Sequence, residues 1–184
     1  MKLKEHSITL HGQFVTLRPM TENDWDILLK WNSDPDVLYF SEGGDVKSYN
    51  LEQVQDNYRG VSQNALCFII VFDGQPIGKC WLQRMNIERL LKKYSGKDSR
   101  RIDLMIGEKR LWGQGLGTDT IRTLSKFGFE QEGADMIFGL VGGYNLRSIG
   151  AFKRAGYEVD AEIEEPPGEK SKFSYDLVIR REQW

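Results

Sequence analysis

Short apolar runs alternate with amphipathic stretches along the chain and predict strands and helices in turn. Strands are expected where apolar and β-branched residues cluster between turn residues, over 14–18, 66–72, 77–83, 101–106, 134–141, 157–163 and 173–180. Helices are expected where apolar residues recur at helical spacing, over 21–31, from Ser33, over 51–61, over 118–129 and from Asn145. Residues 41–50 are polar and predict a loop, whereas 85–100 fit neither pattern, with a mobile tip expected at 94–98. The order of these elements predicts one α/β domain over residues 1–184.

A glycine-rich loop separates the strand at 101–106 from the helix at 118–129. Its residues are Arg110, Leu111, Trp112, Gly113, Gln114, Gly115, Leu116, Gly117 and Thr118. Glycines let a backbone fold tightly so that N–H groups converge, and the start of the next helix adds positive charge. The loop therefore favours a phosphate-bearing cofactor. Its Gly-x-Gly-x-Gly spacing matches neither the P-loop nor the dinucleotide-binding fingerprint.

A second motif begins at Asn145, which is expected to cap a helix. Leu146, Ile149 and Phe152 follow at three-residue steps and form an apolar stripe. The basic pair at 153–154 suits the C-terminal end of a helix dipole, and Gly156 suits a helix stop.

Together the two motifs resemble those of the GCN5-related N-acetyltransferases, the GNAT family. Arg110-x-x-Gly113-x-Gly115 is similar to the acetyl-CoA pyrophosphate loop, and Asn145-x-x-Ser148 followed by Phe152 and Ala155-Gly156-Tyr157 is similar to the second motif. The resemblance implies a single-domain GNAT fold, with a central mixed, mostly antiparallel twisted sheet flanked by helices. It also implies acetyl-CoA as the cofactor.

The resemblance further implies which residues contact coenzyme A. Backbone groups of Met105 and Ile106 would pair with the pantetheine arm like an added strand, and the N–H groups of residues 111–118 would hold the pyrophosphate. Asn145 and Phe152 complete the implied cofactor contacts, together with Arg110. Further phosphate charge would be balanced by basic residues at Lys109, Arg122, Lys153 and Arg154.

The implied reaction is attack of an amine on a thioester, which needs a base because an alkyl amine with a pKa near ~10 is protonated at neutral pH. Asp103 is the candidate base, since it lies on the central strand two residues before Met105 and so shares a face with it. The alternative is that Asp103 merely pairs with Arg100 or Arg101. Many family members carry a tyrosine where this chain has Phe152, so the proton for the leaving thiolate has no such donor here.

The N-terminal half most resembles the aminoglycoside 6′-N-acetyltransferases. A polycationic acceptor favours an acidic cleft, and the candidate substrate-binding residues are Glu42, Asp45, Trp81 and Asp103, with Glu164 and Glu165 as further carboxylates and Tyr39 or Phe40 as walls. Those enzymes tend to carry an aspartate before the second motif, where this chain reads Leu140-Val141-Gly142-Gly143-Tyr144. Three alternatives stay open: a protein N-terminal acetyltransferase of the ribosomal-protein alanine type, acylation of a siderophore precursor or a polyamine, and a non-catalytic CoA-binding module.

Composition limits the partners. A net charge of −2 gives no reason to expect nucleic acid, and no apolar run approaches the length of a membrane span. Cys67 and Cys80 lie in apolar strand-like runs and are expected to be buried thiols of a cytoplasmic protein. No clustering of histidines and cysteines indicates a metal site. The expected partner is a small-molecule amine, and both a monomer and a homodimer remain open.

Overall fold

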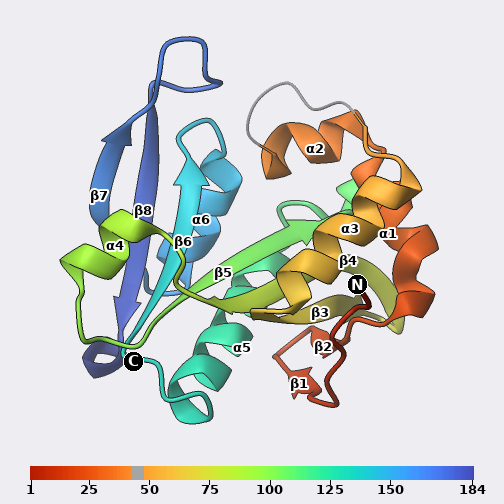
Figure 1. The fold of residues 1–184 in the computed structure, drawn as a ribbon, viewed down its shortest axis with the longest axis horizontal. Helices are drawn as coiled ribbons and strands as arrows, with labels where there is room; N and C mark the ends of the chain where they lie inside the picture. Colours follow the sequence, from red (N-terminus) through yellow and green to blue (C-terminus); the bar gives the residue numbers. More distant parts are fainter. Residues whose placement is uncertain (43–47) are drawn as a thin grey trace.

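The computed structural model describes residues 1–42 and 48–184 and contains one eight-stranded sheet in the order β1-β2-β3-β4-β5-β6-β8-β7 (Figure 1). Among the strand pairs of the described residues, only that of β5 with β6 is parallel, which confirms the mixed, mostly antiparallel sheet that the resemblance implies. The strands are β1 (Leu10–His11), β2 (Thr16–Pro19), β3 (Ala65–Phe72), β4 (Gln75–Arg84), β5 (Ser99–Ile106), β6 (Met136–Gly142), β7 (Glu158–Glu164) and β8 (Phe173–Arg180).

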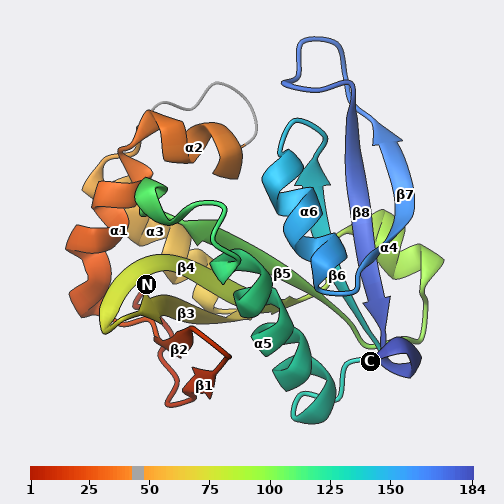
Figure 2. The ribbon, with the colours of Figure 1, turned by 180° about the vertical axis from the view of Figure 1, so that it is seen from behind.

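Helices cover both faces of the sheet. The helices α1 and α3 lie on one face, and α5 and α6 lie on the other, as the view from behind shows (Figure 2). The α-helices are α1 (Trp25–Asn32), α2 (Pro35–Ser41), α3 (Leu51–Ser62), α4 (Glu88–Lys93), α5 (Leu116–Glu130) and α6 (Leu146–Arg154), and the 3-10 turns are Glu22–Asp24, Lys109–Leu111 and Arg181–Gln183. None of the helices in the described ranges is long and apolar enough to cross a lipid bilayer.

Three buried clusters make the core of the described residues, the smallest of them around Leu90, Phe138 and Val178 beneath α4. The largest cluster fills the space between the sheet and α5, with Leu82, Ile102 and Leu124 among its members. The second cluster lies beneath α1 and α3 and includes Trp31 and Trp81. Cys67 and Cys80 are buried free thiols, as expected, and burial raises the pKa of the Cys67 thiol to about 12.

Helix starts follow the capping residues in the sequence. Thr21 accepts a hydrogen bond from Asn23 N–H, and the Asp24 carboxylate accepts one from Thr21 N–H, which together form a capping box. The first turn is 3-10 rather than α, so α1 begins at Trp25. Pro35 occupies the first turn of α2, where its missing N–H costs nothing.

The sequence interpretation was least accurate near the ends of the strands and in residues 85–100. That segment contains α4, and β5 begins at Ser99 instead of 101. The hairpin between β3 and β4 turns tightly on Asp73 and Gly74, whose φ values of 48° and 71° suit a two-residue turn, so β4 begins at Gln75. The two-residue strand β1 was not expected, because two residues carry no periodicity.

Asp119 fixes the start of α5 relative to the N-terminal hairpin. Its buried carboxylate accepts hydrogen bonds from the backbone N–H groups of Gln13, Phe14 and Val15, at 3.0, 2.7 and 2.9 Å. Three N–H donors satisfy a carboxylate that would otherwise be costly to bury. The first turn of α5 is thereby held in place.

Close approach of two backbones at Gly78 keeps β4 tightly paired to β5. A Cβ atom at Gly78 would lie 2.1 Å from the Met105 carbonyl oxygen, a backbone atom that has no rotamer in which to move away. We predict that Gly78→Ala lowers the free energy of unfolding by about 1–3 kcal/mol, the usual cost of overpacking.

Gly60→Ala is the matched control, because a Cβ there meets nothing within 4 Å and the residue lies inside α3. It should stabilise the protein by up to about 1 kcal/mol through helix propensity. Urea unfolding of both variants measures the difference, and equal stability of the two would contradict the close-approach argument.

Candidate active site

The strands β5 and β6 part beyond Ile102. Their parallel pairing runs from Ser99 opposite Met136 to Ile102 opposite Gly139 and then stops. On its other edge β5 stays paired with β4 as far as Ile106. The segment Asp103–Ile106 therefore has one edge that no strand of the described chain covers, which is a geometry that accepts an added extended ligand.

The glycine loop lies at the end of this fork and leads into α5. Gly113 and Gly115 have φ values of 78° and 84°, in the left-handed region that favours glycine. The first backbone hydrogen bond of α5 runs from Asp119 N–H to Gly115 O at 3.0 Å, and within the described residues no side chain caps the helix. The N–H groups of Leu116, Gly117 and Thr118 thus project from the helix start, where the helix dipole adds positive charge.

A cavity of about 150 Å³, here called the glycine-loop groove, opens beside this helix start. Most of the expected cofactor residues line it: Met105, Ile106, Leu111, Trp112, Gly113, Gly115, Leu116, Gly117, Thr118 and Asn145. The structure brings together residues as far apart in the chain as Met105 and Asn145, because β5, α5 and α6 meet at the fork.

Three expected cofactor residues lie elsewhere. Arg110 and Gln114 do not line the groove, and the Gln114 amide donates to the Arg110 carbonyl at 3.0 Å. Phe152 is 1% exposed, and its ring packs against Tyr157 at a centroid distance of 4.9 Å. It also covers Gly139, where a Cβ would lie 2.4 Å from the ring. Phe152 is therefore a core residue at the point where the strands part.

Two arginines line the groove, and only one of them was expected. Arg154 was among the candidate phosphate partners, whereas Arg147 was not. The guanidinium of Arg147 lies 3.8 Å from the Trp112 ring centroid and 4.2 Å from that of Phe40, and burial lowers its pKa. The position of Arg147 two residues after Asn145, within the second motif, is the sequence feature that could have indicated this location.

The other expected basic residues have different partners. Lys109 forms ion pairs with Asp34 and Asp36, at 2.9 and 2.7 Å. Arg122 donates to the carbonyl of Arg154 at 2.6 Å. Neither residue lines the groove, and neither does Lys153.

Trp112 ties the loop back to β5. Its indole N–H donates to the Ile106 carbonyl at 2.7 Å, so one lone pair of that carbonyl is already used inside the protein. The remaining backbone groups of this edge are the ones available to a ligand that extends along β5.

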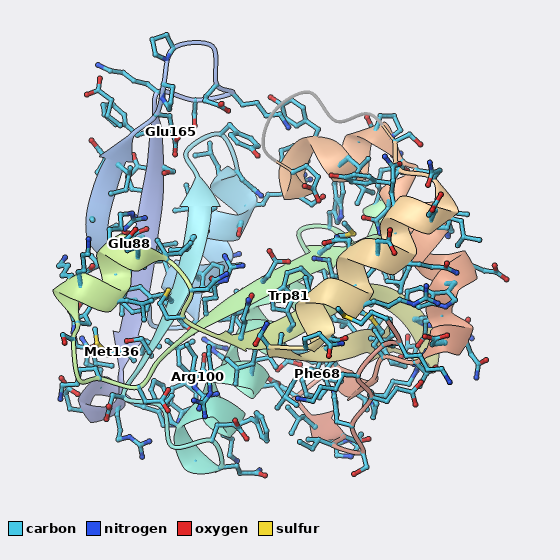
Figure 3. The ribbon with its side chains drawn as sticks, in the orientation of Figure 1. Phe68, Trp81, Glu88, Arg100, Met136 and Glu165 are labelled. Atoms are coloured by element: carbon cyan, nitrogen blue, oxygen red, sulfur yellow. The ribbon has the colours of Figure 1, made fainter. Side chains whose placement is uncertain are left out.

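A second, larger cavity of about 470 Å³ also has Leu104 in its wall and is here called the acidic cavity. Five carboxylate residues line it: Glu42, Asp103, Glu165, Glu169 and Asp176. Two basic residues, Arg89 and Lys170, also line it. Figure 3 labels Glu165 at the end of the molecule where α2 also lies.

Asp103 lies on the wall of the acidic cavity, but its partner is neither Arg100 nor Arg101. The ammonium of Lys79 donates to Asp103 Oδ1 at 2.5 Å, whereas Arg100 pairs with Asp98 and Arg101 binds Gln83. Among the described residues no other side chain hydrogen-bonds Asp103. The side chain of Asp103 is 40% exposed and that of Lys79 only 6%.

Lys79 is a buried cation with two kinds of support. Burial opposes its charge, but the neighbouring Asp103 carboxylate outweighs burial and raises the pKa of Lys79. The ammonium also lies 3.8 Å from the Trp81 ring centroid, a cation–π contact. A lysine inside the apolar run of β4 was a visible signal that the sequence reasoning did not use.

Trp81, a candidate substrate-binding residue, lies beneath a helix. It is 6% exposed, lines neither cavity, and lies where α3 covers the sheet (Figure 3). Its register partner on β5 is Asp103, and the two side chains share a face of the sheet. The Trp81 ring contacts the Lys79 ammonium, whereas Asp103 lines the acidic cavity.

The remaining acidic candidates have separate positions. Burial raises the pKa of the Glu42 carboxyl, which lines the acidic cavity after the end of α2. Asp45 lies outside the described residues. Glu165 lines the cavity, whereas Glu164 does not. Of the two proposed aromatic walls, Phe40 lines both cavities and Tyr39 lines neither.

Asp176 supplies a carboxylate that the sequence reasoning missed. It lies on β8 opposite Leu140, in the region where the aspartate of the aminoglycoside enzymes was found to be lacking, and it is 1% exposed. Both of its oxygens accept from the Arg89 guanidinium, with Nη2 at 2.8 Å from Oδ1. A single aspartate within the apolar run of β8 was the sequence feature that could have indicated a buried carboxylate. No sequence feature indicated that α4 would carry its partner Arg89.

Asn145 joins the two cavities. Its Oδ1 accepts from Ser148 N–H at 3.1 Å, which confirms the expected cap. Its Nδ2 donates to the Phe40 carbonyl at 3.0 Å and so ties α6 to α2. Both cavities have Phe40, Ser41, Leu104, Asn145 and Ser148 in their walls.

The groove fits the pyrophosphate of coenzyme A. Three N–H donors at an uncapped helix start and two arginines form a donor set suited to phosphate oxygens. The space beside Gly113 and Gly115 is open to a ligand, since a Cβ at either position would meet nothing within 4 Å. An extended arm leaving this groove would run along the uncovered edge of β5.

Comparison with known proteins agrees with this geometry. The chain is 26% identical over 166 residues to aminoglycoside N(6′)-acetyltransferase type 1 from Klebsiella pneumoniae and from Serratia marcescens, covering 88% of this chain and 82% of each relative.

Solved structures share the fold. A structure of AAC(6′)-Ib in complex with ribostamycin and coenzyme A superposes with a TM-score of 0.78 at 24% identity, covering 93% of this chain and 96% of that one. Mycobacterium smegmatis RimJ in complex with CoA-disulfide superposes with a TM-score of 0.77 at 14% identity, covering 96% and 88%.

The family model of the acetyltransferase (GNAT) domain matches residues 15–158, a span that holds β5, the glycine loop and the second motif. The match confirms the family expected from the two motifs, whose enzymes are acyltransferases that use acetyl-CoA. This chain belongs to the GNAT acetyltransferase family.

Proposed function

We propose that this chain is an N-acetyltransferase that moves the acetyl group of acetyl-CoA to a primary amine of a small cationic acceptor. The observation that carries the proposal is the shared wall of the two cavities. A phosphate-binding groove and an acidic cavity meet at Leu104, with Asp103 on the acidic side. A cofactor arm and a cationic amine entering from opposite sides would meet there.

The chain supplies a binding site for each reactant. When bound, acetyl-CoA brings a thioester carbonyl that an amine can attack. The N–H groups at the start of α5 would hold the pyrophosphate, with Arg147 and Arg154 balancing its charge. The N–H of Ile106, on the uncovered edge of β5, would stabilise the negative oxygen that develops at the carbonyl, whereas the Met105 backbone faces Gly78 of β4.

Asp103 would take the proton of the acceptor ammonium. A free alkyl amine has a pKa near ~10, so the ammonium must lose a proton before it can attack. Lys79 holds Asp103 Oδ1, which leaves Oδ2 to accept from the amine directly or through water. Lys79 is then a positioning residue rather than a catalytic one.

Phe152 gives no proton to the departing sulfur. Its neighbour Tyr157 is buried, and the Tyr157 hydroxyl is bonded to Ser125 Oγ at 2.7 Å. A thiol pKa near ~8.5 makes the thiolate an acceptable leaving group without an acid.

Among cationic acceptors, an aminoglycoside is the first candidate. The curated relatives are aminoglycoside 6′-N-acetyltransferases, and five carboxylate residues line the cavity that would hold the drug. Arg89 and Lys170 offset part of that charge. A protein N-terminal acetyltransferase and a non-catalytic CoA-binding module are the outcomes that the first assay must separate from it.

The assay measures thiol release from acetyl-CoA with kanamycin- and tobramycin-like aminoglycosides, spermidine, lysine derivatives and alanine- or serine-starting peptides. Turnover with aminoglycosides alone supports the drug as acceptor, and turnover with peptides moves the substrate to the alternative. Coenzyme A binding without turnover of any amine would refute the proposed reaction.

The glycine loop predicts a selective loss of cofactor affinity. Gly115→Ala places a Cβ at a φ of 84° and costs about 1–2 kcal/mol of backbone strain, so the loop should relax and turn its N–H groups away. We expect the KM for acetyl-CoA to rise about tenfold while kcat at saturation changes little.

Gly133→Ala is the matched control. Gly133 also has a positive φ, 73°, and open space around its Cβ position, but it lies after α5 and lines neither cavity. It should lose similar stability with an unchanged KM. Equal KM values for acetyl-CoA in the two variants would contradict the proposal that the glycine loop binds the pyrophosphate.

The assignment of Asp103 as the base predicts that its substitution lowers turnover. Asp103→Asn keeps the side-chain shape but removes the proton acceptor, so kcat should fall about 10²–10⁴-fold while affinity for acetyl-CoA stays the same. Because this variant leaves the Lys79 ammonium buried without its carboxylate, it should also unfold more easily.

The variants Lys79→Met and Lys79→Met/Asp103→Asn separate the two effects. Lys79→Met keeps the carboxylate and should retain most of kcat, whereas the double variant should recover stability without recovering kcat. Wild-type turnover in Asp103→Asn would remove Asp103 from the mechanism.

A further inference from the structure

The ammonium of Lys170 is held by groups of α2 and of the segment after β6. Nζ donates to the carbonyl oxygens of Tyr39 and Glu42, at 2.9 and 2.8 Å. It also lies 4.8 Å from the Tyr39 ring centroid and 5.3 Å from that of Tyr144. These two carbonyls and two rings are called the cation cage below.

The chemistry of the cage suits an ammonium group of any origin. Carbonyl groups at the C-terminal end of a helix carry partial negative charge, and Tyr39 lies in the last turn of α2. Aromatic faces attract cations, more strongly where water is partly excluded. Nothing in this set of acceptors requires that the cation belong to a lysine of the same chain.

Contacts independent of Lys170 also hold the cage together. The Tyr144 hydroxyl donates to the Glu42 carbonyl at 3.1 Å, and the Tyr39 and Tyr144 rings meet edge to face at 5.6 Å. The nearby bond from Asn145 to the Phe40 carbonyl ties the same two segments together. The cage can therefore persist when Lys170 leaves.

Lys170 reaches the cage from a third element. It belongs to the connection between β7 and β8, which extends at the same end of the molecule as α2 in both views (Figures 1 and 2). Glu42, Tyr144 and Lys170 all line the acidic cavity, and so does Asp103. One cavity thus contains the candidate base and a preformed ammonium site that the chain itself fills.

We infer that the cation cage is a second ammonium subsite of the acceptor cavity and that Lys170 occupies it as an internal competitor. A diamine would place its reacting nitrogen at Asp103 and its distal ammonium in the cage, displacing Lys170. A monoamine leaves Lys170 in place. The inference rests on the proposed function, because it takes the acidic cavity as the acceptor site.

Competition lowers the apparent affinity of the diamine by the fraction of molecules in which the cage is free. Removing the competitor should therefore strengthen diamine binding alone. A lysine that served only to tie the β7–β8 connection to α2 would act differently, since its loss would disturb the binding of every acceptor.

The experiment titrates coenzyme A-saturated protein with α,ω-alkanediamines of increasing length, each matched with the monoamine of equal length, by calorimetry. We expect Lys170→Met to bind the best-fitting diamine about tenfold more tightly than the wild type, with the monoamine unchanged. Lys170→Arg keeps the charge and should behave as the wild type.

A further variant tests the cage itself. Tyr144→Leu in the Lys170→Met background should abolish the gain for the diamine and leave the monoamine unaffected. Weaker diamine binding in Lys170→Met, or equal changes for both amines, would overturn the inference.

Failure of the proposed function can be distinguished from failure of the subsite inference. It would appear as an absence of acetyl transfer to any amine in the thiol-release assay, whereas the calorimetric difference between diamine and monoamine needs no turnover. If no amine binds any of the variants, the subsite is refuted as well.

Discussion

The parting of β5 from β6 is the constraint on which both cavities depend. A parallel pair that continued beyond Ile102 would cover the edge of Asp103–Ile106, which an extended ligand could otherwise use. The fork has a visible physical support, because Phe152 packs on Gly139, the last residue of β6 that pairs with β5. On the other edge Gly78 lets β4 follow β5 as far as Ile106. One strand is thus held firmly on one side and exposed on the other.

The two sides of the fork carry opposite electrostatic character. The groove has the start of α5 and the cations Arg147 and Arg154, which suit a phosphate. The acidic cavity has more carboxylates than cations, which suits an amine. Since Leu104 lies in the walls of both, the proposed reactants would be sorted by charge before they meet. Affinity for each can be altered without altering the other, which is why the Gly115 and Asp103 variants are expected to separate KM from kcat.

Sequence reasoning reached the parts of the site that are continuous in the chain. The glycine loop and the Asn145 cap are local motifs whose backbone requirements are written in neighbouring residues, and their positions were predicted correctly. Contacts between distant elements were not predicted. Lys79 and Asp176 each stand as one charge in an apolar strand, so burial with a partner was foreseeable, but the partner was not. Trp81 shares a face of the sheet with its register partner Asp103 but lines neither cavity, because alternation along a strand does not say which part of that face a helix will cover.

The acidic cavity is not an empty negative site, because the chain places two of its own cations in the wall and a third, Lys79, behind Asp103. Lys79 neutralises Asp103 from beneath, Arg89 neutralises Asp176, and Lys170 fills the cation cage. Without these cations, five clustered carboxylate residues would repel one another and favour protonation. Lys79 is buried and Arg89 makes a two-point contact, so both are costly to remove. Lys170, carried by a surface connection and bound to neutral carbonyls and rings, is the cation that an acceptor can replace at least cost.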